Sequence, residues 1–221
     1  ITATTTFTNG YLYVFDGSQA CSEAAIETDC ISSGATGVGK GPITNGSATA
    51  YFKPPANGTY KIGIDSYGEG GDVTLKVVEF DPATNQTCAT AKTLTLTNGK
   101  LTEEGFTIGT TNEFAGLIKC GQTNAFDGGQ TYYKLAMTAG QDYGIGLTAD
   151  HAAAYYVFSA ASACTAASID TDCASGGTTG TFGQITGASG GATGGVFTPA
   201  ASGDYYIVID TPTAADVGGY T

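Results

Sequence analysis

The chain has 221 residues, a net charge of −12 and eight basic residues, all of them lysine. This charge disfavours binding to nucleic acid or to an anionic membrane surface, and the lack of arginine removes bidentate phosphate recognition. No apolar run approaches the roughly 20 residues that cross a bilayer as a helix. With 34 glycines, 13 tyrosines and only 13% charged residues, the composition is typical of an all-β protein rich in turns.

Short β-prone runs follow one another along the chain, separated by turn clusters such as NG, DGG and PPANG. The runs lie at residues 11–15, 49–52, 59–65, 73–80, 93–97, 106–109, 131–137, 143–147 and 204–210. No stretch sustains apolar residues at helical spacing for three turns. This spacing predicts antiparallel β-sandwich modules with a jelly-roll-like arrangement.

Two parts of the chain are copies of each other. YLYVFDGSQAC at 11–21 aligns with AYYVFSAASAC at 154–164, an offset of 143, and KPPANGTYKIGID at 53–65 aligns with TPAASGDYYIVID at 198–210, an offset of 145. Copy two has about sixty residues before this match that copy one lacks, and copy one continues through VTLKVVEF where copy two stops. We therefore expect a partial module at 1–81 without its N-terminal strands and a near-complete module at 82–221 without its last strand.

Six cysteines, one histidine and no CxxC pair favour disulfides over zinc, and hence a compartment outside the cytoplasm. The cassettes CSEAAIETDC and CTAASIDTDC occupy matching places in the two copies. Treating both alike predicts the pairs Cys21–Cys30 and Cys164–Cys173, which leaves Cys88 for Cys120.

Candidate chemical groups are sparse, and we expect no enzyme activity. The single histidine, His151, lies in an alanine-rich stretch without a serine motif and is expected to be a surface or turn residue. The cassettes are acidic, and Asp29 and Asp172 are weak candidates for calcium ligands, but no DxDxDG loop is present. No other metal or cofactor site is expected. Glycans are possible partners at the sequons of Asn45, Asn57 and Asn85.

The second copy resembles a known family. Its runs TYYKLAMTAGQDYGIGL at 131–147, TPAASGDYYIVID at 198–210 and the closing GGYT are similar to the bacterial pre-peptidase C-terminal domain. The resemblance implies a small extracellular β-sandwich that serves as a non-catalytic appendage of secreted proteins, with no catalytic residues to carry over. Residues 11–80 match as a partial copy.

The unequal ends of the two copies suggest strand exchange. A sandwich without one strand leaves unpaired backbone groups that invite another strand. Residues 1–7, with Ile1, Ala3, Thr5 and Phe7 on one face, have the length and character of a donor strand. A competing alignment places the same residues over 144–153, where they form a strand of their own module.

Two functions remain open at this point. The first is a structural subunit of a bacterial or archaeal extracellular filament or surface assembly, polymerising head to tail by strand complementation. The alternative is a set of tandem accessory or adhesive modules, possibly carbohydrate-binding, in a larger secreted protein.

Overall fold

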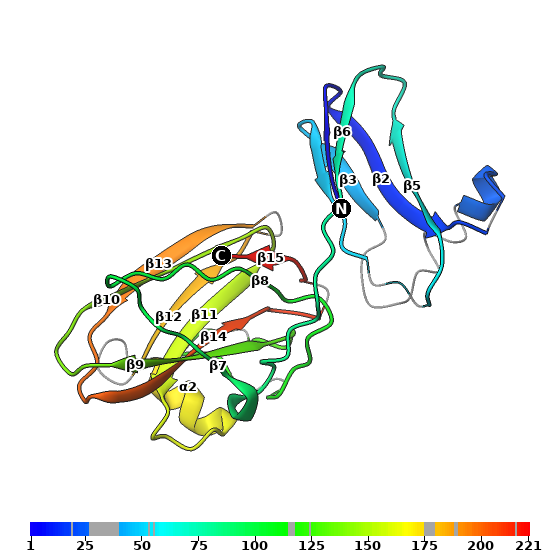
Figure 1. Ribbon diagram of the computed structural model, residues 1–221. Coiled ribbons are helices and arrows are strands. Elements are labelled where there is room, and N and C mark those ends of the chain that lie inside the picture. The colour runs from blue at the N-terminus through cyan, green and yellow to red at the C-terminus, as the bar shows by residue number, and fades with distance from the viewer. Residues whose placement is uncertain are drawn as a thin grey trace. The chain divides into compact units, whose positions relative to one another are not determined.

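The computed structural model describes residues 1–18, 20–26, 40–52, 54, 56–114, 118–123, 125–174, 180–187, 190–214 and 216–221, without the side chains of residues 40 and 41 (Figure 1). Two compact units are present, Ile1–Asp81 and Pro82–Thr221, here called unit 1 and unit 2. Nearly all regular secondary structure in these ranges is strand, which confirms the predicted all-β class.

Unit 1 is built on one antiparallel sheet of six strands in the order β5-β2-β3-β4-β1-β6. The strands are β1 (Thr2–Thr5), β2 (Asn9–Asp16), β3 (Lys40–Thr44), β4 (Ser47–Thr49), β5 (Tyr60–Ser66) and β6 (Val73–Lys76). A two-residue turn joins β3 to β4, where Asn45 and Gly46 have φ angles of 54° and 78°. Asn-Gly is the pair that best tolerates positive φ at both positions of such a turn. The buried core comprises Ala3, Phe7, Leu12, Ile43, Ala48 and Ala50.

Unit 2 contains a four-stranded sheet in the order β13-β10-β15-β8 and a five-stranded sheet in the order β12-β11-β14-β9-β7. Its elements are the 3₁₀ turn η1 (Cys88–Thr90), β7 (Lys92–Thr93), β8 (Gly105–Phe106), β9 (Thr131–Met137), β10 (Tyr143–Ala149), β11 (Ala153–Ser159), α2 (Ala166–Ala174), β12 (Gly180–Ile185), β13 (Gly191–Phe197), β14 (Gly203–Asp210) and β15 (Gly219–Tyr220).

Two hydrophobic clusters hold unit 2 together. In the first, Leu147 and Phe197 of the four-stranded sheet pack with Tyr155 and other side chains of the five-stranded sheet. The second lies on the opposite face of the five-stranded sheet, where Ile169 of α2 packs with Tyr156. Figure 1 shows α2 beside the strands that it covers, β11 and β12. The five-stranded sheet is therefore buried on both faces.

Corresponding strands pair in the same order in both units. In unit 1, β2 lies between β5 and β3, and β1 lies between β4 and β6; in unit 2, β11 lies between β14 and β12, and β10 lies between β13 and β15. The register agrees with the sequence alignment, because Leu12 faces Ile64 and the aligned Tyr155 faces Ile209. Among its described residues, unit 1 has no counterpart of β7, β8 or β9.

Residues 1–7, predicted as a donor strand, form part of unit 1. Ala3 of β1 faces Ala48 on one side and Leu75 on the other. Ala3 and Phe7 are buried in the core, whereas Ile1 and Thr5 are half-buried. In this single chain residues 1–7 thus contribute a strand to their own unit, as the competing alignment expects, although the register makes Ile1 equivalent to Ile145 and differs from that alignment by one residue. A connection of only three residues joins β1 to β2 and keeps β1 close to the strands of its own unit.

Several predicted strands are shorter than expected. β6 ends at Lys76 instead of Phe80, and the runs at 93–97 and 106–109 contribute only β7 and β8. Val77 and Val78 are exposed, and no described strand pairs with them. A β-prone run becomes a strand only where a partner strand accepts its hydrogen bonds.

Candidate functional site

The disulfides of unit 2 connect its N-terminal segment, residues 82–142, to the region of α2. Cys88 is bonded to Cys164 and Cys120 is bonded to Cys173, with Cα–Cα distances of 6.5 and 4.9 Å. The predicted pairs Cys164–Cys173 and Cys88–Cys120 are therefore wrong. All four cysteines are nevertheless disulfide-bonded, which fits an oxidising compartment.

A helix in the second cassette explains the correction. α2 spans Ala166–Ala174, and the Thr165 hydroxyl accepts a hydrogen bond from the Ser168 amide at 3.4 Å near its start. A nine-residue separation along a helix is about 13 Å, whereas a disulfide needs Cα atoms within about 7 Å. Cys164 lies just before α2 and Cys173 lies in its last turn, so the helix holds the two cysteines too far apart to form a disulfide. The sequence-based expectation of a loop missed a short alanine-rich helix of fewer than three turns.

Asp170 reinforces the connection between α2 and the N-terminal segment of unit 2. Its Oδ1 accepts hydrogen bonds from the amides of Lys119 and Cys120, both at 2.7 Å. Cys120 has a φ of 48°, so two amide donors in a row are presented to one carboxylate. This acidic residue of the cassette holds a turn in place.

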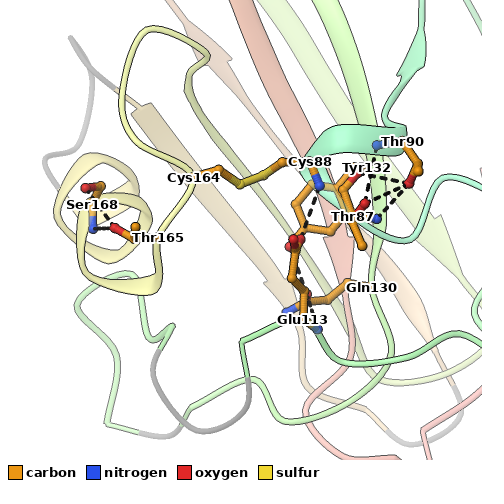
Figure 2. The surroundings of a disulfide bond; sticks show 9 residues. All are labelled: Thr87, Cys88, Thr90, Glu113, Gln130, Tyr132, Cys164, Thr165 and Ser168. Carbon is orange, nitrogen blue, oxygen red and sulfur yellow. Dashed lines mark hydrogen bonds between the residues drawn. A yellow bond between two sulfur atoms is a disulfide. The ribbon is translucent and has the colours of Figure 1, made fainter.

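The first disulfide lies beside a chain of buried polar groups (Figure 2). Glu113 Oε2 accepts a hydrogen bond from the Cys88 amide at 3.1 Å, and the Glu113 amide donates to Gln130 Oε1 at 3.1 Å. Gln130 Oε1 also accepts from the Tyr132 hydroxyl at 2.8 Å. These bonds satisfy polar groups that burial would otherwise make costly.

Asp210 ends this chain of contacts in the core. It is fully buried and accepts hydrogen bonds from Gln130 Nε2 at 2.8 Å, the Tyr156 hydroxyl at 3.0 Å and the Thr211 amide at 2.7 Å. Burial raises the pKa of Asp210 to about 7, although these three donors act in the opposite direction. Through these bonds the Asp210 carboxylate at the end of β14 links Gln130 to Tyr156 of β11.

The first cassette starts in the same way as the second but has a different cysteine state. The Ser22 hydroxyl accepts from the Ala25 amide at 3.4 Å, and residues 23–26 are helical. Cys21 is exposed and, among the described residues, has no disulfide partner. Cys30, predicted to pair with Cys21, lies outside the described residues.

Candidate metal ligands do not gather into a built site in the described part of the chain. Asp172 Oδ2 accepts a hydrogen bond from the Ser162 hydroxyl at 2.6 Å beside a shallow, open depression, and Asp29 falls in a range that is not described. One described group of three, Cys88, Glu113 and Cys164, lies within 4.8 Å. Its two sulfurs form a disulfide and are not thiolate ligands.

His151 has a triad-like environment that is closed to substrate. Its Nδ1 lies 3.1 Å from Asp150 Oδ1, and its Nε2 lies 3.1 Å from the Thr107 hydroxyl. Both His151 and Thr107 are buried, and the Thr107 hydroxyl also accepts from the Gly218 amide at 3.0 Å. Of the predicted alternatives, a surface or a turn residue, His151 is the second, because it lies in the β10–β11 connection but is buried. It joins β8, β15 and the β10–β11 connection.

The sequons differ in accessibility. Asn45 and Asn57 are exposed, but Asn85 is buried and its Nδ2 donates to the Tyr132 carbonyl at 2.8 Å. Asn85 is thus a structural residue of unit 2 and is poorly placed to receive a glycan.

One edge of β10 pairs with β15 only near its C-terminal end in the described structure. Thr148 and Thr221 exchange two backbone hydrogen bonds of 2.8 Å, and Ala149 faces Tyr220. Strand residues alternate in direction, so the amides and carbonyls of Gly146 and Gly144 point to the same edge. No described strand reaches them there, although β13 covers the opposite edge from Tyr143 to Ala149.

In unit 1 the matching edge belongs to β1, and β6 covers more of it than β15 covers of β10. Thr4 faces Thr74 as Thr148 faces Thr221, and β6 then continues so that Ala3 faces Leu75 and Thr2 faces Lys76. Sequence inspection pointed to a missing strand in unit 2, but only the register identifies β10 as the strand whose edge is open.

Comparison with known protein families and with curated proteins finds no match for this chain. No described helix is both long enough and apolar enough to span a membrane.

Proposed function

We propose that this chain is a structural subunit of an extracellular filament or surface assembly whose copies join head to tail by β-strand addition. The observation that carries the proposal is the open edge of β10 at Gly144 and Gly146. Unpaired backbone groups at the edge of a sheet are a template for another strand. An added backbone would lie in the plane of the sheet, in the direction in which the amides and carbonyls of Gly144 and Gly146 point.

Unit 1 indicates what kind of strand fits. There the edge beyond the Thr4–Thr74 pair is filled by Leu75 and Lys76, an apolar residue followed by a polar one. The following residues, 77–80, are not part of a described strand, and Val77 and Val78 are 60% and 49% exposed. We assign the donor to this region of a second copy. Donor and acceptor lie in different units, so the contact is heterologous and can propagate into a filament.

The chemistry of the chain supports an extracellular, non-catalytic role. Two disulfides suit an oxidising environment, and the described polar clusters around Asp210 and His151 are buried and fully engaged within the fold. The resemblance to the pre-peptidase C-terminal domain points to the same class of protein.

The test uses the full chain and a peptide with the sequence of residues 73–80, VTLKVVEF. We expect the chain to form species that sediment faster as its concentration rises, and filaments by negative-stain electron microscopy. The peptide should compete and shorten them. Gly144→Pro removes an edge amide and should block assembly, whereas the control Gly144→Ala keeps that amide and should assemble.

Tandem modules of a larger secreted protein are the second candidate, because β1 is held within its own unit and is not free to exchange. In that case the chain stays monomeric at all concentrations, yet the peptide binds and is blocked by Gly144→Pro. An exposed aromatic pair, Tyr11 and Tyr67 with ring centroids 5.9 Å apart, offers such modules an adhesive or carbohydrate-binding surface. A monomeric chain that does not bind the peptide contradicts both candidates.

A further inference from the structure

The N-terminal segment of unit 2 makes three kinds of contact with the elements that follow it in the chain. β9 pairs with β14 over seven residues, from Met137 facing Gly203 to Thr131 facing Ile209. β8 covers the outer edge of β15. Cys88 and Cys120 form the two disulfides to Cys164 and Cys173. All of these elements belong to residues 82–142.

The strand that corresponds to β14 lacks such a partner in unit 1. β5 pairs with β2 in the same register as β14 pairs with β11, but β5 is the last strand of its sheet. Ile64 is half-buried, whereas the aligned Ile209 is 6% exposed under β9 and its neighbours. In the described part of unit 1, no strand pairs with the outer edge of β5, where unit 2 has a seven-residue strand pairing.

The strand that corresponds to β15 is also uncovered. Val73 faces Thr5 as Tyr220 faces Ala149, so the two positions are equivalent. Tyr220 is 6% exposed beneath β8, but Val73 and Leu75 are 43% and 42% exposed on β6, the other terminal strand of the sheet. Exposed β-branched and leucine side chains on an edge strand mark a surface that another segment covers.

Cys21 supplies an independent third observation. It precedes a helical turn capped by Ser22, as Cys164 precedes α2 capped by Thr165. Cys164 is bonded to Cys88, whereas Cys21 is exposed and unbonded among the described residues. Unit 1 therefore has Cys21 as the counterpart of Cys164, but its described residues contain no counterpart of Cys88.

We infer that unit 1 is the docking surface for a two-cysteine segment of the same type as residues 82–144, supplied from outside residues 1–221. This segment adds a β9-like strand to β5, covers β6 with a β8-like strand, and places its first cysteine against Cys21. A second copy is not the source, because its own 82–142 segment is already bonded to its unit 2. The inference does not depend on the open edge of β10.

The covalent step is an ordinary thiol oxidation. The thiols of Cys21 and of the incoming cysteine lose two protons and two electrons to oxidised glutathione, forming one S–S bond and releasing two molecules of reduced glutathione.

The register shows where to attach the segment. With Ala3 equivalent to Leu147, Ile1 is equivalent to Ile145. Residues 82–144 can therefore be duplicated directly before Ile1 of the full chain, so that the added Gly144 leads into Ile1 as the native one leads into Ile145. The chain is refolded with a mixture of reduced and oxidised glutathione.

We expect non-reducing peptide mapping to link Cys21 to the added copy of Cys88, and amide exchange in β5 to slow by at least tenfold relative to the unextended chain. A control with Cys88→Ser and Cys120→Ser in the added copy should keep the slower β5 exchange without the new bond. The native Cys88–Cys164 and Cys120–Cys173 bonds verify that unit 2 has folded.

Three results would overturn the inference. Cys21 could be recovered bonded to Cys30, the added segment could remain protease-sensitive with β5 exchange unchanged, or the unextended chain could form dimers through Cys21. A chain that fails to assemble through β10 leaves all three readouts intact, so failure of the proposed function and failure of this inference are distinguishable.

Discussion

Thr148 and Thr221 exchange two backbone hydrogen bonds of 2.8 Å, and in the described structure they are the last pair on that edge of β10. Within one strand, the amides of Gly144 and Gly146 should exchange with solvent much faster than those of Ile145 and Leu147, which point to β13. Hydrogen exchange followed by NMR measures both sets together. Equal protection of the four amides in the monomer would show that the edge is already covered.

The disulfides should dominate the stability of unit 2. Replacing Cys120 and Cys173 together by serine opens a loop of 53 residues and is expected to lower the free energy of unfolding by about 4 kcal/mol in the chain-entropy model. Chemical denaturation of unit 2 measures the change. Substituting Cys21 by serine provides the control and should leave unit 2 unchanged. Recovery of a Cys164–Cys173 peptide from the native protein would contradict the observed connectivity.

Asp210 should make unit 2 less stable as the pH rises from about 4 to 7. Its folded-state pKa of about 7 lies above the ordinary value of 3.8, so in this window the native state holds a proton that the unfolded state has lost. Stability then falls with rising pH and levels off above the folded-state pKa.

Asp210→Asn tests this by removing the titration, and the slope of stability against pH should become flatter. Asp204→Asn, an exposed position on the same strand, is the control and should keep the wild-type slope. If the variant loses too much stability to be compared, the carboxyl carbon of Asp210 can be titrated directly by NMR. A midpoint near 4 would contradict the expected shift.

Thr107 should act as a structural link and not as a nucleophile. Thr107→Val keeps the shape of the side chain but leaves His151 Nε2 and the Gly218 amide without their partner, which is expected to cost about 1–3 kcal/mol. Thermal unfolding of this variant can be compared with that of Thr102→Val, an exposed substitution expected to be nearly neutral. Unchanged stability of Thr107→Val would show that the contacts around His151 are not needed for folding.

Local sequence patterns predicted strands well where a partner strand is present. The runs at 131–137 and 143–147 and the pair of aligned runs ending at Asp65 and Asp210 all form strands. The run at 73–80 has the same β-branched character throughout, yet it is strand only as far as Lys76. Intrinsic preference is equal along such a run, and the position of the neighbouring strand sets its length.

Side-chain roles were harder to anticipate. The two cassettes look alike, and similarity alone suggested that each closes on itself. A helix in the second one separates its cysteines and directs them to Cys88 and Cys120. His151 likewise reads as a turn residue, but its second partner, Thr107, lies 44 residues away in the chain, whereas Asp150 is its sequence neighbour. Neither the cysteine pairing nor the Thr107 contact leaves a signal at short range.

The sequence by itself determined the all-β class, because composition, alternation and turn residues act locally and all agree. Tertiary structure decided which cysteines meet, where residues 1–7 pair, and that the open edge belongs to β10. These are long-range relationships set by register and by the rise of a helix, so they exist only once the strands have been placed beside one another.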